Sequence, residues 1–207
     1  MNNEEAKKFV TSVFDKIKNA KTLDEIQKIP KEFKELKDPK NKFDESKYPK
    51  INFTITEKEI DSLKKIDEKY VLQPNDPVLK LLYAMVWKQG DLKKIDRIIE
   101  GIKNEKSNIG NSVVFYQFGK HLANPSAEPI IDQHVIRAFS VYETDQSDEK
   151  TINKLRKKKT LTSKDSTSIS NYKEWLEKHI QKDPKEQKEC LYYIDKILFS
   201  TGKAIKL

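Results

Sequence analysis

The sequence has a single cysteine, few glycines and no long apolar run, and each of these absences excludes a class of protein. Cys190 alone cannot form an internal disulfide, nor a four-thiolate iron–sulfur or zinc site within one chain. His121 and His179 stand far apart, without cysteines or paired acids nearby, so we expect no metal site and no cofactor. No stretch is apolar over the length that spans a bilayer, and the first residues, MNNEEAKKF, are typical of neither a signal nor a transit peptide. We therefore expect a soluble protein of the reducing cytoplasm.

Charge, in contrast, is abundant. Lys and Arg number 41 against 33 for Asp and Glu, which gives a net charge of +8 over 207 residues. An excess of positive charge fits an anionic partner such as nucleic acid. A lysine-rich, solvated surface explains the same excess without any partner, so both interpretations stay open.

Helix signals recur along the whole chain. Apolar residues follow the spacing of one helix face, as at Val10, Val13, Phe14 and Ile17. Residues 77–88 are apolar on most sides, which predicts a central, buried helix. Helix starts are predicted by the capping boxes Thr22–Glu25 and Thr56–Glu59, by Asn171 with Glu174, and by the acid–proline pairs Asp76-Pro77 and Asp183-Pro184.

Two polar segments interrupt this pattern. Residues 38–54 carry two prolines and little periodicity, so we expect an irregular connection there. Residues 143–170 are also polar, and we expect a basic loop in this segment. No segment indicates a strand. The sequence predicts an all-α fold of roughly nine or ten helices.

The stretch from Asn108 to Phe139 combines a glycine turn, a helix, a polar corner and a second helix. The corner places one acid, Asp132, at the start of the second helix. Within it, residues 129–137 read PIIDQHVIR and match the pattern P-[IV]-x-D-x-H-[VI]-x-R. This stretch resembles the helix-hairpin-helix DNA glycosylases of the endonuclease III superfamily. Residues 81–92 and 194–203 look similar to uncharacterised bacterial proteins grouped loosely with these glycosylases.

The resemblance implies a fold and an activity. It implies a two-lobed helical glycosylase-like fold, in which residues 1–75 are N-terminal helices of a shared lobe and residues 76–142 form the central helix-hairpin-helix lobe. Residues 143–207 then form a basic loop and C-terminal helices that return to the shared lobe. The resemblance also implies that Asp132 is the catalytic acid of a base-excision enzyme in DNA repair, and that Ser112 takes the position at which the family carries Lys or Ser.

This chemistry agrees with the residue types. Cleavage of the bond between base and sugar passes through an oxocarbenium-like state, which a nearby carboxylate stabilises. Because a serine is no amine nucleophile, Ser112 indicates a monofunctional hydrolase. Lys106 keeps open a third hypothesis, a lyase in which that lysine attacks the sugar.

We expect double-stranded DNA as the partner, since a base must be flipped out of a duplex that is held by its phosphates. The candidate DNA contacts share a basic or small polar character: Lys106, Asn108, Gly110, Asn111, His134, Arg137, Lys154, Arg156, Lys157 and Lys158.

A structural role competes with each of these assignments. Asp132 can be an N-cap worth ~1 kcal/mol, His134 a packed side chain, and Arg137 one half of a surface ion pair. The basic cluster can be a solvated loop. Residues 105–108 read EKSN where the family hairpin begins L-P-G. The alternative function is therefore a non-catalytic helical module that binds DNA or protein and retains the glycosylase fold.

Overall fold

The computed structural model contains helices and no strand within the residues it describes, which are 1–64, 81, 84–85, 88–90, 92–105, 112–180 and 182–207. This confirms the predicted all-α class. In chain order the elements are α1 (Asn3–Asn19), α2 (Leu23–Lys28), the 3-10 helix η1 (Ile29–Lys31), α3 (Lys34–Lys37), α4 (Glu57–Lys64), α6 (Leu92–Ile102), α7 (Val113–Ala123), α8 (Gln133–Glu143), α9 (Glu149–Lys157), the 3-10 helix η2 (Ser163–Asp165), α10 (Ser166–His179) and α11 (Pro184–Ala204).

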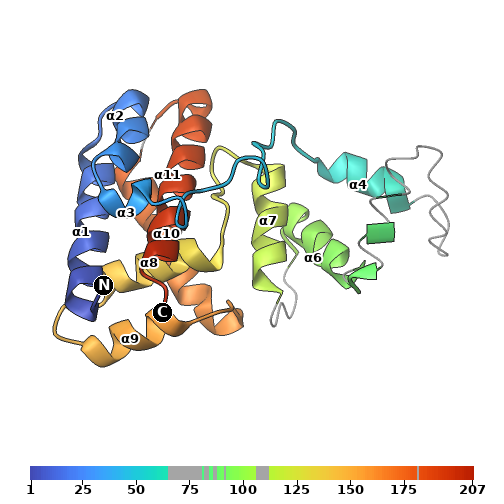
Figure 1. Cartoon of the computed structure of the whole chain (residues 1–207). Coiled ribbons are helices and arrows are strands. Elements are labelled where there is room, and N and C mark those ends of the chain that lie inside the picture. Colours follow the sequence, from blue (N-terminus) through green and yellow to red (C-terminus); the bar gives the residue numbers. More distant parts are fainter. Residues whose placement is uncertain (65–80, 82–83, 86–87, 91, 106–111, 181) are drawn as a thin grey trace.

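The main bundle consists of α1–α3 and α8–α11 and contains both chain termini (Figure 1). Helix α8 lies at its centre, where it packs against α1, α9, α10 and α11. The core is aromatic as well as aliphatic: the ring of Phe14 on α1 stacks on Tyr142 at 4.3 Å and lies 6.0 Å from Phe139. The first and last helices of the chain thus share one core with α8.

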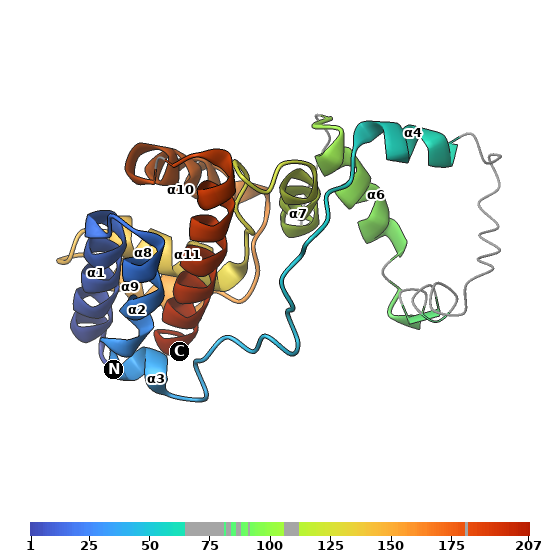
Figure 2. The same cartoon turned by 90° about the horizontal axis from the view of Figure 1, so that it is seen from above.

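The satellite unit consists of α4, α6 and α7 and lies beside the main bundle (Figures 1 and 2). Among the described residues, its buried core contains Ile60, Ile102 and Leu122. Helices α6 and α7 cross in close contact at Gly101 and Gly119. A Cβ atom added to Gly119 would lie 2.1 Å from the carbonyl oxygen of Ile98. Only glycine therefore permits this approach of the two backbones.

Several predicted helix starts are confirmed by their hydrogen bonds. The backbone N–H of Thr56 donates to Glu59 at 2.7 Å, and the Glu59 N–H donates to the Thr56 hydroxyl at 3.3 Å. Asp183 accepts from the N–H groups of Lys185 and Glu186 and begins α11. Residues 38–54 form turns and irregular backbone without a helix, as predicted.

Other expectations are wrong. Residues 149–157 form α9 rather than a loop, because Ile152 enters the main core and Leu155 packs against it. Asn171 lies inside α10 and does not begin it, since the capping box of Thr162 and Asp165 precedes the helix.

The predicted buried helix 77–88 falls largely outside the described residues, as does the predicted start Asp76-Pro77. Two of its described side chains are exposed, Leu81 by 67% and Met85 by 58%, so the expectation of burial is wrong at these positions. The described buried residues of the satellite core come from α4, α6 and α7.

The boundary between the two units also differs from the expected segment 76–142. Helices α6 and α7 pack on each other, whereas α8 packs on α11 and α1 and belongs to the main bundle. Among the described helices, none is both long and apolar enough to cross a membrane.

Candidate functional site

Asp132 is the N-cap of α8. Its backbone is extended, with φ −124° and ψ 157°, and its Oδ1 accepts a hydrogen bond of 2.6 Å from the N–H of His134. The side chain is half-buried. Within the described part of the chain, its second carboxylate oxygen, Oδ2, has no hydrogen-bond partner. Asp132 therefore caps α8, as the structural interpretation of the sequence proposed, and it uses Oδ1 for this hydrogen bond.

His134 and Arg137, the other two members of the motif, are turned into the main bundle. Arg137 is 2% exposed; its guanidinium lies 2.6 Å from Nδ1 of His134 and donates to the carbonyl oxygens of Gly202, at 3.0 Å, and of Lys158. Burial lowers the pKa of both side chains, while Asp132 opposes the shift. A neutral His134 can accept from the arginine at Nδ1. Arg137 thus joins α8 to the ends of α9 and α11, and it is neither a surface ion pair nor an exposed phosphate contact.

The segment that leads into Asp132 is held by a buried acid, Asp195 of α11. Its Oδ2 accepts from the N–H of Ile130 at 2.8 Å, and its Oδ1 accepts from the hydroxyl of Tyr172 at 3.1 Å. Burial raises the pKa of Asp195 to about 7, although both hydrogen bonds act in the opposite direction. The same surroundings raise the pKa of Tyr172 well above its ordinary value. Asp195 therefore fixes the backbone two residues before Asp132.

Sequence reasoning did not find Asp195. One signal was available, because Leu191, Ile194 and Leu198 mark the buried face of α11 and Asp195 stands among them. An acid at such a position requires hydrogen-bond partners inside the fold.

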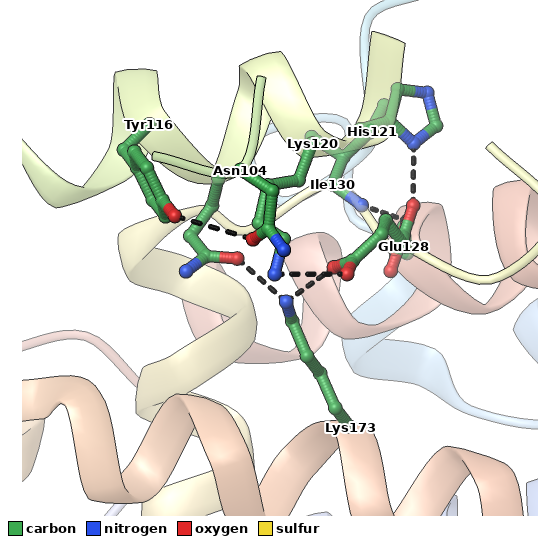
Figure 3. Close-up of polar contacts among 9 residues, drawn as sticks. Asn104, Tyr116, Lys120, His121, Glu128, Ile130 and Lys173 are labelled. Atoms are coloured by element: carbon green, nitrogen blue, oxygen red, sulfur yellow. Dashed lines mark hydrogen bonds and ion pairs between the residues drawn. The ribbon is translucent and has the colours of Figure 1, made fainter. Parts of the chain in front are cut away.

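A second polar cluster joins α7 to α10 and is centred on Glu128 (Figure 3). The carboxylate of Glu128 pairs with Lys173 and, at 3.3 Å, with Lys120, and Lys173 also donates to Gln117 at 2.7 Å. The carbonyl oxygen of Glu128 lies 2.7 Å from Nδ1 of His121. Burial lowers the pKa of Lys173, and Glu128 partly offsets this effect. The cluster links the satellite unit to the main bundle through partly buried charges.

The predicted hairpin between α6 and α7 is described only at its two ends. Helix α6 closes with Asn104 in the left-handed conformation, at φ 52°, and with a hydrogen bond of 3.0 Å from the N–H of Glu105 to the oxygen of Glu100. Ser112 precedes α7, and its side chain makes no capping hydrogen bond. The remaining candidates of the hairpin lie outside the described residues: Lys106, Asn108, Gly110 and Asn111.

The basic cluster of α9 divides into buried and exposed members. Arg156 is 2% exposed and donates to Ile205 O, Asn3 Oδ1 and Met1 O, so it fastens both chain ends and does not face a partner. Lys158 pairs with Asp165. Lys154 and Lys157 are exposed. Of the four predicted phosphate contacts in this cluster, these two are the ones open to solvent.

A cavity of about 180 Å³ lies elsewhere, between α2–α3 and α11, and Asp132 does not line it. No group of three metal-ligating side chains occurs among the residues that the structure describes. Comparison of the chain with protein-family models, curated proteins and solved structures gave no match.

Proposed function

We propose that the protein binds DNA through a two-lobed fold of the helix-hairpin-helix glycosylase type, and that Asp132 is the acid of an N-glycosidic hydrolase. The single observation that supports this most is the state of Asp132: one oxygen is fixed by the cap, and Oδ2 has no partner among the described residues. A fixed carboxylate with a free oxygen has the form that stabilises positive charge on a sugar.

The order of elements supports the same proposal. The helix pair α6–α7 is followed by a nine-residue connection, 124–132, and then by the helix that Asp132 begins. Asp195 holds the approach to this corner rigidly through Ile130, as a catalytic carboxylate requires.

The second candidate is the non-catalytic module, and a specific observation favours it. His134 and Arg137 form their contacts inside the main bundle, and Asp132 caps its own helix. The three residues of the motif D-x-H-x-x-R thus stabilise the fold, and this role explains them without a catalytic reaction. In this case the protein binds DNA or a protein partner without excising a base.

The test compares wild type with Asp132→Asn for binding to undamaged duplex DNA and to a duplex with an abasic analogue, across a salt series. Asparagine caps a helix nearly as well as aspartate, so the variant is expected to fold and to bind. For an enzyme we expect tighter binding to the abasic analogue, weakening with salt as phosphate contacts require.

Release of damaged bases is then measured with both proteins. Release by wild type and not by Asp132→Asn supports the hydrolase. DNA binding without release of any base from a broad panel of lesions supports the module. Absence of binding to either duplex at low salt contradicts the DNA-binding proposal as a whole. A covalent adduct after borohydride treatment would instead indicate the lyase and its amine.

A further inference from the structure

Three aromatic rings form a cluster between α11 and the segment 38–50. The ring of Phe199 lies 5.3 Å from Phe43 and 6.0 Å from Tyr48, and Phe43 and Tyr48 are 5.6 Å apart. Tyr48 is 55% exposed although it contacts both other rings. Tyr48 therefore presents an aromatic surface to solvent from a defined position.

Lysines accompany these rings. The Nζ of Lys203 lies 5.9 Å from the centre of Phe199, and the Nζ of Lys196 lies 5.7 Å from Phe43 and 5.2 Å from Tyr192. Lys196 is neutralised by Glu45. In the described part of the chain, neither Lys42 nor Lys203 forms an ion pair, although Glu45 attracts Lys42 as well as Lys196, so one carboxylate faces several lysines and the surface keeps a net positive charge. We name Phe43, Tyr48, Phe199, Lys42 and Lys203 the aromatic–lysine surface.

The cavity of about 180 Å³ opens on this surface and is lined by Lys42, Phe43, Lys196 and Ser200, among others. Pockets for whole ligands usually begin at about 300 Å³. The cavity is therefore too small for a complete nucleotide and has room only for part of one, such as a planar ring.

One ring of this surface also contacts the motif of the candidate site. The ring of Phe199 meets the ring of His134 edge-on at 4.8 Å, and the backbone N–H of His134 donates to Asp132. Because His134 is buried, this contact lies inside the main bundle.

We propose that the aromatic–lysine surface binds unpaired nucleotides of a nucleic-acid strand. A base stacks on Tyr48, and the flanking phosphates contact Lys203 and Lys42. Stacking on an aromatic side chain accepts any base because every base has a π-face, and lysines beside it neutralise the backbone. The inference extends the proposed DNA binding to a second form of the ligand, and it does not require Asp132 to be catalytic.

The test measures binding of a fluorescent single-stranded oligo-dT to wild type, Tyr48→Ala and the matched control Tyr48→Phe. Because Tyr48 is exposed, both variants are expected to fold, which circular dichroism checks. We expect Tyr48→Ala to weaken binding of the single strand about 10-fold and Tyr48→Phe to bind like wild type. Duplex binding by Tyr48→Ala is expected to stay unchanged.

A further variant, Lys203→Gln, tests the phosphate contact. It is expected to lower the salt slope of oligo-dT binding by about 0.7, the value for one phosphate contact with a single strand. Equal affinity of all three Tyr48 proteins for oligo-dT, or no binding of it by wild type, overturns the inference. These outcomes are separate from failure of the proposed function, which is read from the duplexes. A matching oligo-rU shows whether DNA or RNA is preferred.

Discussion

The main bundle and the satellite unit differ in the means that hold their helices together. In the main bundle, large rings such as Phe14, Phe139 and Tyr172 are almost completely buried. Among the described residues of the satellite unit, the buried core contains Ile60, Ile102 and Leu122, and Ile95 of α6 remains 42% exposed. The described contacts that hold this unit are the α6–α7 crossing, the Glu128 cluster and the packing of Val113 in the main core.

Both units nevertheless use a glycine where two helices meet. Gly202 of α11 lies against the backbone of His134 in the main bundle, and Gly119 of α7 lies against Ile98 in the satellite unit. The contacts are similar, but their surroundings differ. Damage in the main bundle is expected to affect the whole fold, whereas damage in the satellite unit is expected to open that unit alone.

The largest effect should come from Asp195 and should appear as a pH dependence. Its folded pKa is about 7 against an ordinary 3.8, so the folded state binds the proton more tightly than the unfolded chain. This group's contribution to stability is therefore complete below about pH 4 and is lost as the pH rises to about 7, a change of about 4 kcal/mol. Asp195→Asn cannot titrate, and it should flatten the stability curve over this interval.

Urea denaturation of both proteins at pH 4, 5.5 and 7 measures this difference. Other carboxylates and His134 also titrate, but they do so equally in the two proteins. A difference in stability between wild type and variant that is the same at all three pH values would contradict the assignment to Asp195.

Gly202→Ala should destabilise the main bundle by about 3 kcal/mol. The added Cβ would lie 1.9 Å from the carbonyl oxygen of His134, so α8 and α11 must separate. This shift also disturbs Arg137, whose guanidinium donates to the oxygen of Gly202. A lower urea midpoint, seen alike by far-UV and near-UV circular dichroism, is the expected result. An unchanged urea midpoint would show that α8 and α11 can separate to admit the added Cβ without loss of stability.

Gly119→Ala should cost about 2 kcal/mol, and the loss should be confined to the satellite unit. Its Cβ would lie 2.1 Å from the oxygen of Ile98 and force α6 away from α7. Amide hydrogen exchange is expected to accelerate in α6 and α7 while α1, α8 and α11 keep their protection. If protection falls equally in all of these helices, the two units do not unfold separately, and the distinction between them fails.

The sequence predicted those features that depend on neighbouring residues. The Thr56–Glu59 capping box and the start at Asp183-Pro184 were read correctly, because a cap uses side chains within one turn of its helix. The N-cap role of Asp132 was recognised for the same reason. Asp195 was missed, because its partners Ile130 and Tyr172 lie 65 and 23 residues away. Periodicity cannot show contacts between distant segments.

The difference between local contacts and contacts of distant segments also explains the errors in the basic cluster at residues 154–158. Arg156 was predicted to contact DNA together with its lysine neighbours, yet it stands four residues after Ile152 and shares its buried face. Its partners are the chain ends Met1, Asn3 and Ile205, which no local pattern can indicate. A buried arginine of this kind becomes visible only when the packing of α9 on α1 is known.

The smallest effect concerns Asp132, and it separates the two functions proposed for it. Asp132→Ala removes the acceptor of the His134 N–H and should cost ~1 kcal/mol, whereas Asp132→Asn should cost a few tenths because asparagine is an equally good N-cap. Thermal unfolding of the two variants measures how much the N-cap contributes to stability. Base release measures whether the carboxylate contributes to catalysis. If Asp132→Asn is as stable as wild type and releases no base that wild type releases, the carboxylate has a role beyond the cap. If both variants release the same bases as wild type, the carboxylate has no role in catalysis. Asp132 then serves only as the N-cap of α8.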